Sequence, residues 1–166
     1  MGNGQSSSSR RWVKLSSLLL LSVFLVLTLS SCGLGVRTRS LFGGKAVLDV
    51  SIADTANNNN PVAVDYVLVY DENLLKELLK MPAKDWFERR LQFKRDYPED
   101  SGFISLEWEW TPGQRVPPQD LPLEARARGA IVFALYYSKG DHRARIEPNQ
   151  NLKITFLENS FMIEPR

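Results

Sequence analysis

The chain has 166 residues, of which 43% are hydrophobic and 24% are charged, ordinary values for one globular domain with its own core. The formal net charge of +2 depends on three basic residues near the start. Beyond residue 31 acids and bases nearly balance, so the charge gives no indication of nucleic-acid binding. The single cysteine, Cys32, excludes a disulfide framework within the chain.

The first 31 residues have the layout of an export signal. A polar segment with Arg10, Arg11 and Lys14 precedes an apolar run, and two serines then lead to Cys32. The apolar run is shorter than the roughly 20 residues that a transmembrane helix needs. The opening "MGNGQS" also fits an N-myristoylation pattern at Gly2, but that anchor does not need an apolar run behind it.

The stretch "LSSC" at residues 29–32 resembles the lipobox of bacterial lipoproteins. In those signals the peptide is cut before the cysteine, the thiol receives a diacylglycerol and the new amine is acylated. The resemblance implies a signal peptide over residues 1–31 and covalent lipid on Cys32. Several acyl chains hold a protein stably at a membrane, whereas one chain holds it only marginally. Because Gly33 stands where an aspartate retains lipoproteins in the inner membrane, the implied location is the outer membrane.

The segment that follows, residues 32–44, is rich in glycine and has no periodicity, which predicts a flexible tether. The folded domain is predicted over residues 45–166. It opens with the alternating "KAVLDVSIA", a polar stretch "DTANNNN" that ends the strand, and a second strand in "PVAVDYVLVY". The second strand becomes apolar on both faces, as a central strand would.

Two amphipathic helices are predicted next, one over residues 72–81 and one that begins at Pro82 and ends before Pro98. The apolar stripe of the first helix contains Leu74, Leu75, Leu78 and Leu79. The amphipathic pattern of the second rests on Trp86, Phe87, Arg90, Leu91 and Phe93. Strands then resume in "FISLEWEW", "RGAIVFALYYS", "RARI", "NLKITFLEN" and "SFMIEP". The pattern predicts a mainly β protein, an antiparallel β-sandwich of seven or eight strands with a two-helix insertion.

Few residues suggest catalysis. The only histidine, His142, lies in "GDHR", where a turn is expected. Glu107 and Glu109 are two residues apart on a strand, which predicts a solvated face balanced by bases on a neighbouring strand. Trp108 and Trp110 share a side with apolar residues and are expected in the core. The residues therefore favour a binding module over an enzyme and indicate no metal site.

The order of the motifs resembles one family, the outer-membrane lipoproteins of bacterial type VI secretion systems (TssJ or SciN). The resemblance rests on the lipobox, "NPVAVDYVLVYD", "WEWTPGQ" at residues 108–114 and "LPLEARARGAIVFALYYSKGDHRARI" at residues 121–146. It implies a transthyretin-like β-sandwich, lipid-anchored at the outer membrane and facing the periplasm. It also implies a place in the secretion membrane complex.

The same resemblance implies a partner, the IcmF-like inner-membrane protein TssM, whose periplasmic end contacts the loop between the first two strands. The matching residues here are Asp54, Thr55, Ala56, Asn57, Asn58, Asn59 and Asn60. A run of asparagines offers many hydrogen-bond donors and acceptors for a polar contact. The residues alone leave two other interpretations open: a solvent loop without a partner, and a helical insertion over residues 74–95 that touches an acidic partner or lipid.

A second function from another class also fits the composition. A periplasmic lipoprotein of this kind could bind cell-wall glycan or another ligand through exposed aromatic rings. The exposure of Trp86, Trp108 and Trp110 separates the two hypotheses, because a stacking platform must be open to solvent.

Overall fold

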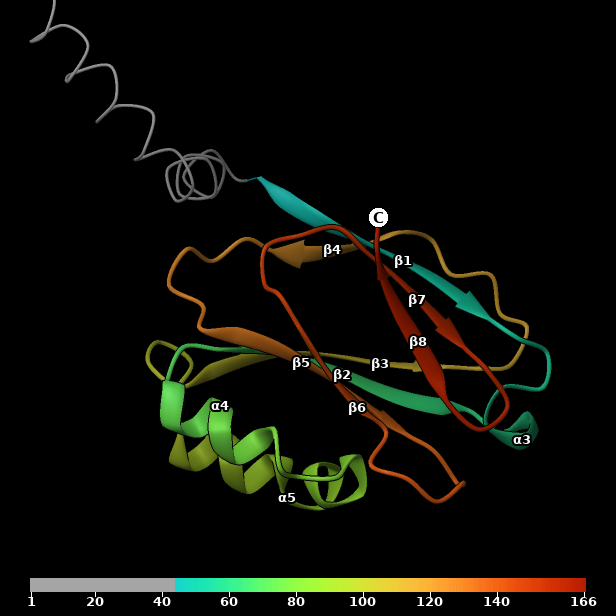
Figure 1. The fold of residues 1–166 in the computed structure, drawn as a ribbon, viewed down its shortest axis with the longest axis horizontal. Helices are drawn as coiled ribbons and strands as arrows, with labels where there is room; N and C mark the ends of the chain where they lie inside the picture. Colours follow the sequence, from blue (N-terminus) through green and yellow to red (C-terminus); the bar gives the residue numbers. More distant parts are fainter. Residues whose placement is uncertain (1–43) are drawn as a thin grey trace, which may run out of the picture.

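The computed structural model describes residues 44–166, which form two packed β-sheets with helices on one outer face (Figure 1). One sheet has the order β4-β1-β7-β8 and the other β3-β2-β5-β6. The first contains β1 (Lys45–Ile52), β4 (Gln119–Pro122), β7 (Leu152–Phe156) and β8 (Phe161–Pro165). The second contains β2 (Val62–Val69), β3 (Phe103–Trp110), β5 (Gly129–Leu135) and β6 (Arg143–Ile146). The predictions for the signal, Cys32 and the tether lie outside the described residues.

The predicted sandwich of seven or eight strands with a two-helix insertion is confirmed, and the strands number eight in the described part of the chain. One pair differs from the antiparallel expectation, because β1 and β7 run parallel, with Leu48 opposite Leu152. All other pairs in this range are antiparallel. These two strands are far apart in sequence, so no local turn signal sets their relative direction.

A core between the two sheets is built from the inward residues of both. In β2 these are Val62, Val64, Tyr66 and Leu68, which alternate with residues facing the other way. Trp110 is 4% exposed and packs against Phe156 with ring centroids 5.5 Å apart. Trp108 is partly buried and stacks on Trp110 at 5.3 Å. The tryptophans of this strand therefore lie against the core, as the sequence predicts.

A second core lies between the outer face of the β3-β2-β5-β6 sheet and the helices α4 (Glu72–Leu78) and α5 (Ala83–Asp96). Asp71 begins α4 by accepting a hydrogen bond from the Leu74 N–H at 2.7 Å. Trp86 is fully buried and stacks on Phe133 of β5 at 5.0 Å. This second core explains why the end of β2 is apolar on both faces.

One residue of the predicted helical stripes was placed wrongly. Leu91 is 65% exposed, whereas Trp86 and Phe93 of the same helix are buried. Leu91 lies five positions after Trp86, which is about 140° around a helix of 3.6 residues per turn. The α5 face toward the sheet is therefore narrower than the sequence pattern suggests.

Candidate functional site

The loop between β1 and β2, residues 53–61, contains all seven residues that the resemblance assigns to partner binding. Asp54, Thr55, Asn58 and Asn59 are exposed and Asn60 is half-buried. Ala56 and Asn57 are both 0% exposed. These two residues cannot touch a partner while the loop keeps this conformation, so the available surface is the other five.

The loop has a defined conformation in which three consecutive residues have unusual backbone angles. Asn57, Asn58 and Asn59 have positive φ values of 48°, 53° and 62°, within the short element α3 (Ala56–Asn59). Among non-glycine residues, asparagine tolerates the left-handed region best, because its short side chain can hydrogen-bond locally. The run of asparagines therefore has a conformational role besides offering polar groups.

The buried Asn57 side chain connects the loop to the segment after β5. Its Oδ1 accepts a hydrogen bond from the Tyr137 N–H at 2.8 Å, and its Nδ2 donates to the Pro61 carbonyl at 2.7 Å. Beyond the last pair of β2 and β5, Ala63 with Leu135, these two backbone groups would be the next to meet in the ladder. The side-chain amide of Asn57 lies between them like an inserted peptide group, and it gives the Tyr137 N–H and the Pro61 carbonyl a hydrogen-bond partner each.

The backbone of the loop also binds the turn between β7 and β8. The N–H groups of Asn57 and Asn58 donate to the carbonyls of Leu157 and Glu158, each at 3.2 Å. Tyr136, just after β5, donates its hydroxyl to the carbonyl of Ser160 in the same turn at 2.7 Å. Burial raises the pKa of the Tyr136 phenol to about 12, so the group stays a donor at neutral pH. Three loops therefore form one rigid end of the sandwich.

A fourth segment, the "TPGQ" turn after β3, packs on the same loop. The Gly113 N–H donates to the Ala53 carbonyl at 3.3 Å. Gly113 has a φ of 68°, and a Cβ at this position would lie 2.5 Å from Oδ1 of Asp54. The positive φ of the turn therefore favours glycine here, and a larger residue would also displace the Asp54 carboxylate.

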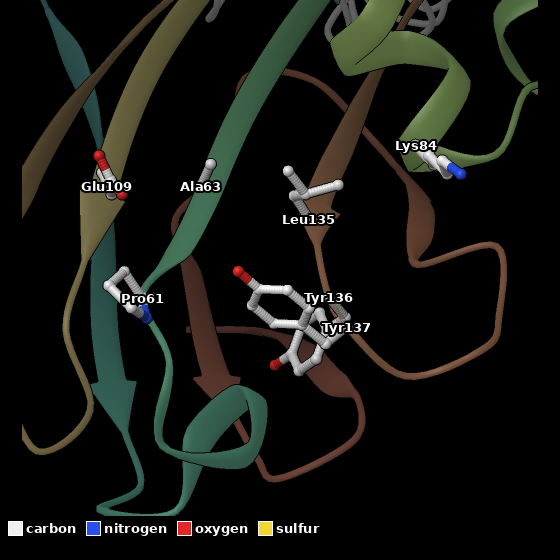
Figure 2. Close-up of a pocket in the computed structure, with 7 residues that line it drawn as sticks. All are labelled: Pro61, Ala63, Lys84, Glu109, Leu135, Tyr136 and Tyr137. Atoms are coloured by element: carbon white, nitrogen blue, oxygen red, sulfur yellow. The ribbon is translucent and has the colours of Figure 1, made fainter.

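A hollow of about 530 Å³ lies beside this loop and was not predicted from the sequence. It is lined by Pro61, Ala63, Lys84, Glu109, Leu135, Tyr136 and Tyr137 (Figure 2). Tyr137 is 78% exposed and Leu135 is 36% exposed. The only signal in the sequence is the extension of the apolar run "GAIVFALYY" past the end of the strand.

A buried acid in β2 was also missed. Asp65 is 0% exposed, accepts a hydrogen bond from Nε1 of Trp86 at 2.8 Å and pairs with Arg90 at 3.1 Å. Burial raises the pKa of Asp65, although Trp86 and Arg90 act against that rise. The acid fixes α5 to the sheet, and its only signal is an aspartate within the apolar run of β2.

The neighbouring glutamate has an unexpected partner. Glu107 faces α5 rather than bases on a strand, and it pairs with Lys94 and with Arg90, the latter at 3.3 Å. Burial raises the pKa of Glu107, but the two bases outweigh that effect and leave the pKa below its usual value. Arg90 and Lys94 of α5 thus form ion pairs within the protein besides contributing to the solvated face of the helix.

His142 lies in the loop between β5 and β6, as expected for a turn residue. It has a φ of 45°, stacks on Tyr136 at 4.8 Å and contacts the Ser138 carbonyl through Nε2 at 2.9 Å. The histidine thus takes part in packing this end of the sandwich. Within residues 44–166, no group of three His, Cys, Asp or Glu side chains is placed to hold a metal ion. No helix in this range is long and apolar enough to cross a membrane.

The tryptophans bear directly on the glycan hypothesis. Trp86 and Trp110 are buried and Trp108 is partly buried against the core. Two of the three therefore have no ring face open for stacking on a sugar, and Trp108 stacks on the buried Trp110. Of the large aromatic side chains between residues 44 and 166, Tyr137 is the exposed one.

Fold and loops together define the class: a β-sandwich with a helical layer on one face and a cluster of packed polar loops at one end. No protein-family model matches the chain, and no curated protein matches it. Solved structures do match it. The T6SS lipoprotein TssJ1 from Pseudomonas aeruginosa is similar with a TM-score of 0.57 and 15% identity, over 74% of this chain and 95% of that one.

Two further structures have the same fold. Serratia marcescens Lip, a membrane-bound component of the type VI secretion system, gives a TM-score of 0.54 and 15% identity, over 74% of this chain and 96% of the other. A chain in the structure of the T6SS protein TssM C-terminal domain from EAEC gives 0.54 and 16%, over 74% and 98%. The resemblance to type VI secretion lipoproteins found in the sequence is thus confirmed in the fold.

Proposed function

We propose that this chain is an outer-membrane lipoprotein of a type VI secretion membrane complex, with a structural and non-catalytic role. The observation that carries the proposal is the shared fold, which extends over 95% of TssJ1, a T6SS lipoprotein. The lipobox-like "LSSC" ending at Cys32 supports it on a separate ground, because it is a motif of the sequence and not a feature of the fold.

The proposed lipid anchor can be tested with a single substitution at Cys32. Cys32→Ser removes the thiol that would carry diacylglycerol, so the precursor should stay unacylated and uncut. Labelled palmitate should enter the wild-type protein and not the variant, and the wild type should fractionate with the outer membrane. Labelling of Cys32→Ser at the wild-type level would overturn the lipoprotein assignment.

The partner we propose is the periplasmic part of a TssM-like inner-membrane protein, bound through the exposed residues of loop 53–61. Support comes from two matching structures, one of the TssM C-terminal domain and one of a type VI membrane complex. Support also comes from the direction of β1. That strand begins at Lys45 and runs into the loop, so about 25 Å of strand separates the anchored end from the loop (Figure 1).

This orientation suits a protein that links two membranes. A lipid upstream of Lys45 would hold one end of the sandwich near the outer membrane, and the loop cluster would then point into the periplasm. Binding to the TssM-like periplasmic domain should be measured with point substitutions on the exposed side of the loop. Asn59→Arg adds a long charged side chain at an exposed position and should weaken binding. Its cost to the fold should be limited to about 1 kcal/mol of backbone strain at the positive φ of residue 59.

A matched control places the same side chain elsewhere. Gln92 is an exposed polar residue on α5, so Gln92→Arg makes the same addition away from the loop and should leave the affinity unchanged. Equal affinity of wild type and Asn59→Arg would refute the loop as the docking surface.

A further inference from the structure

The hollow beside the loop exists because the helical layer stops short of the end of the sheet. On the outer face, Asp65 and Phe133 form a row with Glu107 that α5 covers, and both are 0% exposed. The next row is Glu109, Ala63 and Leu135. The first turn of α5 only borders this row, where Lys84 lines the hollow. Leu135 is 36% exposed, so apolar sheet face is open to solvent here.

A hydrogen bond fixes the backbone that carries the exposed ring at this end. Tyr137 is 78% exposed, and its N–H is bound by Oδ1 of Asn57 at 2.8 Å. A tyrosine offers a large contact area with few rotatable bonds, which is why it is enriched at the centres of protein interfaces. Here the phenol ring projects beside Leu135 and Pro61 (Figure 2).

The hollow is continuous with the loop that we propose as the docking surface. Pro61 ends the loop and lines the hollow, and the Asn57 amide bonds to both Pro61 and Tyr137. Before Pro61, the exposed residues of the loop, Asp54, Thr55, Asn58 and Asn59, are all polar. Specific interfaces combine an apolar centre with a polar rim, and the loop alone provides only a rim.

From these observations we infer that the hollow between Pro61, Leu135 and Tyr137 receives an apolar side chain of the same periplasmic partner domain. The inference rests on the proposed function and deepens it: the loop forms the polar border of the interface and the hollow forms its dry centre. Lys84 and Glu109 lie at opposite borders of the hollow (Figure 2). The inserted side chain is therefore flanked by an acid that faces Lys84 and a base that faces Glu109.

The test uses the full-length lipoprotein in detergent and the TssM-like periplasmic domain, with affinity measured by titration calorimetry. Tyr137→Ser should weaken binding at least about ten-fold, as expected for the loss of a central interface residue. Because the N–H of residue 137 is a backbone group, its bond to Asn57 survives the substitution. Lys84→Glu should also weaken binding, through like-charge repulsion. Leu91→Ser is the matched control, since Leu91 is an exposed apolar residue outside the hollow, at 65% exposure.

The outcomes separate the two proposals. If Asn59→Arg weakens binding while Tyr137→Ser matches the wild type, the inference about the hollow is wrong and the proposed function stands. If the wild type does not bind the partner domain, both fall. A muropeptide from the cell wall should bind neither the wild type nor Tyr137→Ser. Tyr137-dependent muropeptide binding that the partner does not displace would assign the hollow to a glycan and overturn the inference.

Discussion

Removal of the Asn57 side chain tests whether the loop is part of the folded structure. Asn57→Ala deprives the Tyr137 N–H and the Pro61 carbonyl of their partner, at 2.8 Å and 2.7 Å. The site is part-buried, so each group left without its partner costs about 1 kcal/mol, the low end of the range for buried groups, and alanine in the left-handed region adds about 1 kcal/mol. The expected loss in the free energy of unfolding is about 3 kcal/mol. Urea unfolding of the fragment 45–166, followed by tryptophan fluorescence, measures it.

The control for this experiment is two positions away. Asn59 has a similar φ of 62° but an exposed side chain, so Asn59→Ala should cost only the backbone strain of about 1 kcal/mol. Asn57→Gly should keep most of the Asn57→Ala loss, because glycine relieves strain without restoring the amide. If Asn57→Ala and Asn59→Ala have equal stability, the argument about the amide is refuted.

Three further predictions concern the two cores, with stability of the same fragment as the measurement. Trp110→Ala should cost about 3–5 kcal/mol, and a loss below about 1 kcal/mol would contradict its place in the core. Asp65→Ala should cost about 3 kcal/mol, because it leaves the Trp86 indole N–H buried without a partner and Arg90 without its nearest carboxylate; unchanged stability would contradict that role. For Glu107, whose folded pKa lies below the usual 4.5, the ion-pair contribution is present above pH 4.5 and is lost as pH falls through the folded pKa. The advantage of wild type over Glu107→Gln should therefore shrink below pH 4.5, and an advantage that is constant over this range would exclude the ion pairs as its source.

The strands could be predicted from the sequence because their signals are local. In β2, inward-facing residues alternate with residues of the other face, and this pattern can be recognised without knowing what packs against the strand. The inward residues are Val62, Val64, Tyr66 and Leu68. The leucines of α4 and the proline before α5 are local signals too. Leu91 was placed wrongly because the width of a buried helix face depends on the sheet beneath it.

The candidate site could be predicted only in outline. The polar composition of residues 54–60 predicts a loop, but the burial of Asn57 depends on Tyr137, which is 80 positions away in the sequence. Asp65 likewise finds Trp86 and Arg90 at separations of 21 and 25 residues. The hollow depends on where α5 begins relative to the rows of the sheet. Such pairings are set by tertiary structure, and a single sequence carries no direct record of them.

The direction of β1 also has a mechanical consequence. β1 lies inside its sheet, hydrogen-bonded to β4 on one side and to β7 on the other. With a lipid pulling upstream of Lys45 and a partner pulling at the loop after Ile52, tension would run along the length of this strand. The hydrogen bonds on both sides lie across that direction, so they would share the load in shear rather than open one after another. Under the proposed function, a load between the two membranes would therefore act along the direction in which this strand resists separation best.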